Sequence, residues 1–263
     1  MSRERGLRTE RCGGQRPSVT AYRALILLAA ATATIAAAPS RAEKPAPQWL
    51  PAGPVIARLP PAPERTSAPP CTIGEVGPAA FSVNHVVPPN DVYYVLLAAG
   101  SCGACQPPDT ASVSAVHVAL EFPSPCFQPV TVSVVGTTGG PSCPAPDPTQ
   151  VLCPEYGAVL FAGAPGTYDY EIMLLAACPL TADAFLRVSF ASDGLGCATL
   201  ETRPRLQTTA ECSDCRNYNN RAGGNGDVCA LGFPGSLVMY VDVLSCVVPT
   251  LARSWGEIKI RYR

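Results

Sequence analysis

Two Cys-x-x-Cys pairs have the spacing best suited to chemistry in this chain, Cys102-Gly-Ala-Cys105 and Cys212-Ser-Asp-Cys215. Two such pairs can supply the four thiolates of a structural zinc site, and a single pair at a helix N-terminus can carry out redox catalysis. The two pairs lie far apart in the sequence, and neither follows a strand in a βαβ pattern. We therefore expect each of these cysteines to form a disulfide with a partner elsewhere.

The cysteine count supports the same interpretation. The chain has 13 cysteines, and the number becomes even only when Cys12 is removed with the first 42 residues. Thiols at this density suit an oxidising compartment, where they form disulfides. Twelve disulfide cysteines are predicted, with their connectivity left open: Cys71, Cys102, Cys105, Cys126, Cys143, Cys153, Cys178, Cys197, Cys212, Cys215, Cys229 and Cys246.

The segment Asp214–Asp227 is rich in oxygen ligands and glycine. Calcium binds six to eight oxygens from carboxylates, amides and backbone carbonyls on flexible loops, although the order here does not match an EF-hand. The same residues are common in any long turn, so an ordinary loop held by disulfides is the alternative. We expect an exposed loop, and the candidate calcium ligands are Asp214, Asn217, Asn219, Asn225 and Asp227. No other cofactor is expected.

No catalytic motif accompanies the two histidines, His85 and His117. The chain has no Gly-x-Ser-x-Gly elbow, no His-Glu-x-x-His and no phosphate-binding glycine loop. His117 alternates with valines and is expected on the polar face of a strand. Glycoside hydrolysis by two carboxylates leaves no spacing signature. The candidate carboxylates, which we expect on a solvated face, are Glu121, Glu155, Asp169 and Glu171.

The first 42 residues have the organisation of a secretory signal. A basic start is followed by the apolar run Ala24–Ala38 and by the small-residue site Ser40-Arg-Ala42. At 15 residues the run is shorter than the ~20 needed to span a bilayer, so we expect cleavage rather than an uncleaved anchor. Residues 43–70 contain nine prolines and are predicted to be a disordered linker that cannot join a sheet.

The charge of the mature protein limits its partners. The chain has 19 basic and 20 acidic residues, of which the leader holds seven and two, so that 12 and 18 remain and the net charge is −6. Only two lysines are left, Lys44 and Lys259. An acidic surface without a basic cluster excludes nucleic acid and anionic membranes as partners, and we expect no membrane insertion after cleavage.

Residues 71–249 read as one cysteine-rich domain, followed by a C-terminal strand or tail at 250–263. Short apolar runs with period-two alternation are separated by Pro, Gly, Asn and Asp, and no window shows a helical period. This pattern predicts an all-β fold, an antiparallel β-sandwich or jelly-roll-like domain stapled by disulfides. The expected strands are Val92–Ala99, Val113–Phe122, Val130–Val135, Ala158–Ala162, Thr167–Leu175, Ala184–Ala191, Leu206–Thr209 and Leu237–Leu244.

Alternation also predicts which side chains are buried. The residues expected in the core are Tyr168, Tyr170, Ile172, Leu186, Val188 and Phe190. The segment Ile258–Tyr262 alternates in the same way, with Lys259 and Arg261 on the opposite face.

Three segments resemble features of uncharacterised cysteine-rich secreted bacterial proteins. They are Phe185–Phe190, the pair Cys212-x-x-Cys215 with its Asn-rich loop, and the closing Ser254–Lys259. The resemblance covers 71–263 and implies export, but no known activity.

Three functions fit these observations. The first is a non-catalytic extracellular module for surface structure, adhesion or binding of a glycan or protein. The second is an exported hydrolase that acts on polysaccharide through a carboxylate pair. The third is a subunit of a secreted assembly, with Glu257–Tyr262 adding a strand to a neighbour's sheet. The location is secreted or cell-surface, with the periplasm as an option. The placement of the tyrosines distinguishes binding from catalysis: Tyr93, Tyr94, Tyr156, Tyr168 and Tyr170.

Overall fold

The computed structural model describes residues 49–51, 55–59, 71–87, 89–103, 105, 110–222 and 224–247, all within the unit Glu43–Arg263. The predicted signal peptide 1–42, Cys12 and the tail 250–263 lie outside the described residues. The described part has no α-helix, only two short 3-10 turns, Ala99–Ser101 and Asn220–Ala222. Among the described residues, no helix is long and apolar enough to cross a membrane.

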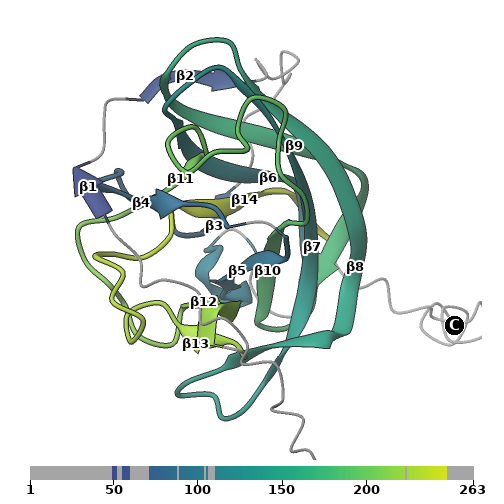
Figure 1. Ribbon diagram of the computed structural model, residues 1–263. Coiled ribbons are helices and arrows are strands. Elements are labelled where there is room, and N and C mark those ends of the chain that lie inside the picture. The colour runs from purple at the N-terminus through teal and green to yellow at the C-terminus, as the bar shows by residue number, and fades with distance from the viewer. Residues whose placement is uncertain are drawn as a thin grey trace, which may run out of the picture. The chain divides into compact units, whose positions relative to one another are not determined.

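Two sheets pack against each other, which confirms the predicted antiparallel β-sandwich (Figure 1). The first sheet has the order β1-β4-β11-β6-β14-β3, and β9 pairs with the other edge of β6 and with β2. Its strands are β1 (Trp49–Pro51), β2 (Val55–Leu59), β3 (Cys71–Gly74), β4 (Phe81–His85), β6 (Thr110–Phe122), β9 (Gly166–Leu180), β11 (Arg205–Thr208) and β14 (Met239–Val247).

The second sheet has the order β13-β12-β5-β10-β7-β8, so the long strand β8 lies at its edge. Every described pairing in both sheets is antiparallel except that of β2 with β9. The strands of this sheet are β5 (Asp91–Leu97), β7 (Cys126–Thr138), β8 (Ala145–Ala162), β10 (Ala184–Phe190), β12 (Asn217–Asn219) and β13 (Gly226–Asp227).

The core lies between the sheets and contains the predicted side chains. Period two places one side of each strand inward, so Val116 and Val118 of β6 meet Val132 and Val134 of β7 in one apolar cluster. All six residues predicted from alternation are buried, which confirms that prediction: Tyr168, Tyr170, Ile172, Leu186, Val188 and Phe190.

Two of the sequence expectations need correction. The predicted Pro-rich linker 43–70 contains two strands, Trp49–Pro51 and Val55–Leu59. A strand at a sheet edge tolerates the N–H donor that Pro51 lacks, and β2 consists of five residues without proline. The segment Asp214–Asp227, expected to be an exposed loop, forms β12, a 3-10 turn and β13, and its strand β12 is buried against β5.

Disulfides join elements that are distant in the sequence. The described pairs are Cys71–Cys102, Cys126–Cys197, Cys143–Cys215, Cys153–Cys178 and Cys212–Cys229, and Cys105 is also disulfide-bonded. The two Cys-x-x-Cys motifs therefore supply cystines, as expected. The side chain of Cys246 lies outside the described set. Cystines at this density belong to an oxidising compartment.

These pairings make a direct prediction about the exported protein. After export it should contain no free thiol, because Cys12 is expected to leave with the signal segment. Intact mass, together with thiol titration in denaturant, measures this number. One reactive thiol or more in most molecules would contradict the prediction.

Candidate functional site

A polar cluster surrounds His117 on the face of the first sheet that points away from the core. The imidazole lies between two carboxylates, with Nε2 3.2 Å from Asp242 Oδ2 and Nδ1 3.6 Å from Asp169 Oδ1. The Tyr240 ring stacks on the imidazole at 4.4 Å, and its hydroxyl donates a hydrogen bond to Asp169 Oδ2 at 2.8 Å. The neighbouring strands β6, β9 and β14 thus bring these four side chains together. Each of them follows and precedes a core residue in its strand, so it points to the opposite face of the sheet.

His117 is charged at neutral pH. Burial by itself lowers its pKa, but hydrogen bonds and Coulomb attraction from Asp169 and Asp242 outweigh burial and raise the pKa to about 9. A protonated imidazole is neither a general base nor a metal ligand. Donor atoms of His117, Glu171 and Asp242 lie within 4.8 Å of one another and could hold a metal ion, which would have to displace that proton.

The candidate catalytic carboxylates are not arranged as a facing pair in a cleft. Glu121 accepts hydrogen bonds from Ser82 and from Arg205 Nη1, the latter at 3.0 Å. Glu155 is ion-paired with Arg187.

Asp169 and Glu171 belong instead to the surroundings of His117. The expectation of a solvated face is wrong for Asp169, which is 8% exposed, because the His117 cluster lies around it. Asp242 was missed from the sequence, although its alternation with Val241 and Val243 in an expected strand was the available signal.

Two of the candidate calcium ligands are neighbours in the structure. Asp214 and Asp227 lie close together beside Cys229, but the Cys229 sulfur is already in a disulfide. The carboxylate of Asp227 accepts hydrogen bonds from the backbone N–H groups of Cys215, Cys229 and Ala230. It therefore organises the turn.

Among the asparagines of this set, Asn219 is hydrogen-bonded to β5. Asn219 is buried and donates hydrogen bonds to Asp91 Oδ1 at 3.1 Å and to the Val92 carbonyl at 2.9 Å. Asn217 is buried in β12, and Asn225 is half-buried. The side chain of Asn219 thus holds β12 against β5.

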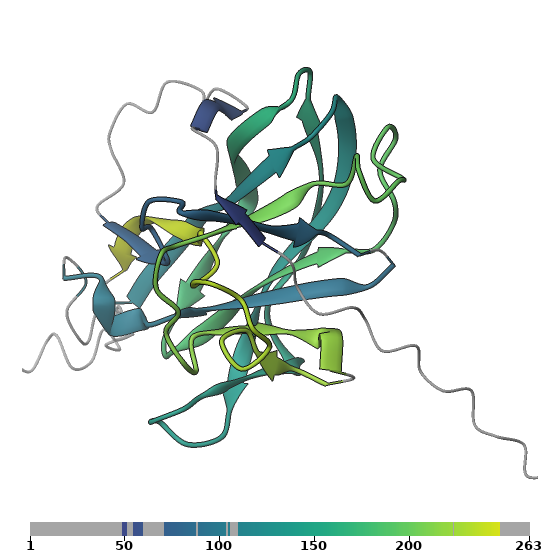
Figure 2. The same ribbon diagram turned by 60° about the vertical axis from the view of Figure 1, so that its left-hand side comes forward.

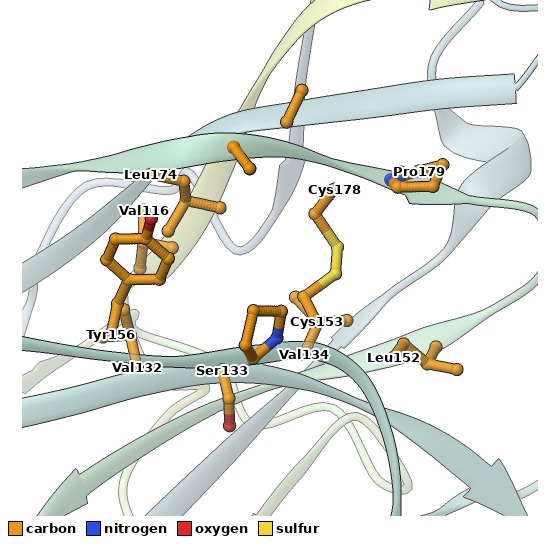
Figure 3. A pocket seen from close by; sticks show the side chains of 13 residues that line it. Val116, Val132, Ser133, Val134, Leu152, Cys153, Tyr156, Leu174, Cys178 and Pro179 are labelled. Atoms are coloured by element: carbon orange, nitrogen blue, oxygen red, sulfur yellow. A yellow bond between two sulfur atoms is a disulfide. The ribbon is translucent and has the colours of Figure 1, made fainter.

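Two adjoining cavities lie between β9 and β8, the edge strand of the second sheet. The larger has a volume of about 590 Å³ and is lined by Tyr156–Phe161 of β8 and by Tyr170–Met173 and Leu175 of β9. The smaller, of about 80 Å³, reaches core residues such as Val116 and Val132 and surrounds the Cys153–Cys178 disulfide (Figure 3). We call the two cavities together the β8/β9 groove.

The groove is apolar and accessible. In Figure 3, Tyr156 of β8 and Leu174 of β9 point toward each other across the smaller cavity. Leu175 is 92% exposed and Val159 is 63% exposed, and Val151, Leu152, Phe161 and Met173 are also exposed on these two strands. Apolar side chains gathered in one exposed place mark an interaction site more often than scattered ones do.

Irregular pairing opens the groove. On β9 the four residues Leu174–Ala177 stand opposite Ser114 alone, because Met173 pairs with Ala115 and Cys178 with Val113. The pairing of β8 with β7 also shifts between Val132 and Gly136. Bulges of this kind bend a strand away from its neighbours, and the disulfide fixes the two bent strands together. Both strands run along the same side of the sandwich (Figure 1).

The tyrosines named as discriminators are inside the protein. Tyr93, Tyr94, Tyr168 and Tyr170 are buried, and Tyr156 is half-buried in the groove. In comparisons of the chain with protein-family models, curated proteins and solved structures, nothing matches.

Proposed function

We propose that this protein is a non-catalytic extracellular β-sandwich module that binds an extended segment of another protein in the β8/β9 groove. The observation that carries the proposal is the larger apolar cavity of this groove, about 590 Å³, beside the edge strand of the second sheet. Extended peptides bind in this way, with backbone groups pairing along a sheet edge and alternate side chains entering pockets. The disulfides support a secreted, cell-surface or periplasmic location.

The chemistry of the groove favours a polypeptide over a glycan. Sugar rings are bound by exposed aromatic faces together with many polar groups, whereas four of the five tyrosines considered are buried. The described groove lining is dominated by Val, Leu, Ile, Ala, Pro and aromatic side chains. Burying such surface is worth roughly 25 cal/mol per Å², so apolar side chains of a partner are its natural ligands.

The hydrolase alternative lacks a comparable observation. The described groove lining has one carboxylate, that of Glu171, and hydrolysis of a glycosidic bond uses two. The polar cluster around His117 coincides with neither cavity, apart from Glu171 at the rim of the larger one.

A peptide-display experiment tests the binding function. The exported protein is expected to select hexapeptides in which apolar residues alternate, and Val159→Asp and Leu175→Asp should each weaken the selected peptides about tenfold or more. Leu200→Asp is the matched control, because Leu200 is an exposed leucine outside the groove. Equal binding by all four proteins, or selection of no peptide, would count against the proposal.

Melting temperatures measured with calcium and with chelator test whether Asp214–Asp227 binds calcium. We expect the melting temperature to be equal in calcium and in chelator, because Asp227 already accepts three backbone N–H groups. Asp227→Ala should lower it under both conditions, since those donors lose their acceptor. A wild-type melting temperature that rises with calcium, and no rise in the variant, would show instead that the loop holds the ion.

A further inference from the structure

The last described strand of the chain ends close to the β8/β9 groove. In β14, Cys246 pairs with Ala111 of β6, and Ala111 pairs on its other side with Leu180 of β9. Val247 therefore lies about two strand spacings, or ~10 Å, from the end of β9 that carries Cys178. The last described residue, Val247, thus lies near the disulfide end of the groove.

We propose that residues 257–262 of the same chain occupy the β8/β9 groove as an internal ligand, which a partner segment must displace. The proposal rests on the binding function above, because it takes the groove to be a site for extended polypeptide. It adds a specific occupant and a means of regulating access.

The composition of this segment matches the groove. In an extended strand, alternation would place Ile258, Ile260 and Tyr262 on one apolar face and Lys259 and Arg261 on the other. The described lining has many apolar side chains, the carboxylate of Glu171 and no basic side chain. An apolar face can enter the groove while the cations lie toward the carboxylate of Glu171 at its rim.

The connecting chain is long enough. Nine residues, 248–256, lie between the end of β14 and the segment, and an extended chain covers ~3.3–3.6 Å per residue, or about 30–32 Å in all. The segment would enter beside Cys153–Cys178 and run along β8 toward Phe161, and it would stop short of Tyr170 on β9, which already pairs with Leu59 of β2. That direction is antiparallel to β9 and parallel to β8, and both orientations support strand pairing.

Covalent connection favours the chain's own segment over that of a second copy. A short tether holds its end at an effective concentration in the millimolar range, far above that of a dilute secreted protein. An internal ligand then lowers the apparent affinity for a partner by the fraction of molecules in which the groove is open.

Photo-crosslinking from the rim of the groove tests this occupant. Leu175 is replaced by p-benzoylphenylalanine in the exported full-length protein, and its 92% exposure makes the replacement compatible with the fold. After irradiation, mass spectrometry should identify residues 257–262 as the main crosslinked peptide. Mixing isotope-labelled and unlabelled protein should give crosslinks only within one chain. Crosslinks between labelled and unlabelled chains would overturn the proposal in favour of a second copy, and no crosslink to 257–262 would overturn it altogether.

Variants in the segment add a control that is independent of partner binding. Ile260→Asp should reduce the crosslink at least tenfold and should raise the affinity for the display-selected peptides by a similar factor. Leu251→Asp, in the connecting chain, should change neither value. If peptides bind in the groove but Ile260→Asp alters neither measurement, the internal ligand is wrong and the binding function stands. If no peptide binds even to Ile260→Asp, it is the binding function that fails.

Discussion

Val188→Asp is expected to unfold the sandwich. Val188 is fully buried in β10, the strand that pairs with both β5 and β7 at the centre of the second sheet. A carboxylate at this position has no partner in an apolar cluster and costs at least ~3 kcal/mol, a large part of the ~5–15 kcal/mol that stabilises a typical domain.

Urea unfolding under non-reducing conditions measures this loss. Val159→Asp, on the exposed side of β8, is the matched control and should change the free energy of unfolding by less than ~0.5 kcal/mol. A Val188→Asp protein that melts within a degree or two of the wild type would show that the core assignment is wrong.

The second large effect is the dependence of stability on His117. Its pKa is raised to about 9 in the folded protein, against an ordinary value near 6.5, so the folded state holds the proton more tightly. The stabilisation of the folded state by this proton is complete below pH ~6.5 and is lost as the pH rises through about 9. The difference between the folded and ordinary pKa values corresponds to about 3 kcal/mol of folding free energy. The groups that face the imidazole are Asp169 and Glu171 from β9 and Tyr240 and Asp242 from β14.

Unfolding in urea at pH 6, 7.5 and 9 tests this dependence. His117→Gln should lower the stability most at pH 6 and least at pH 9, since the variant lacks the cation that both aspartates contact. Removal of one member of a buried charge cluster costs ~3–5 kcal/mol. The prediction fails if the difference between the two proteins is the same at all three pH values.

Local alternation explains what could be predicted from the sequence. The eight expected strands are all present, and Val188 and Tyr170 are buried as predicted. These predictions succeed because the period-two pattern depends only on residues that are close in the sequence. The cysteine pairs could not be predicted, since Cys143 and Cys215 meet only after two elements have folded together. The cluster around His117 depends likewise on strand neighbours, as Asp242 is 125 residues away.

The groove could not be predicted for a different reason. The N-terminal part of β8 contains Pro146, Pro148 and Pro154, and the sequence predicted only Ala158–Ala162 of this 18-residue strand. The expected strand Thr167–Leu175 ended within the irregular segment Leu174–Ala177. The bulge in β9 is defined by the register of its pairing with β6, and the sequence of β9 alone does not specify that register. Figure 2 shows the resulting long strands from a second side.

Backbone hydrogen exchange, with and without a display-selected peptide, tests the central claim most directly. The peptide should slow exchange along Tyr156–Phe161 of β8 and Tyr170–Leu175 of β9, because bound backbone and side chains exclude water there. Exchange at Asp214–Asp227 should stay the same. Protection at that loop, or protection nowhere on β8 and β9 while the peptide remains bound, would contradict a binding site in the β8/β9 groove.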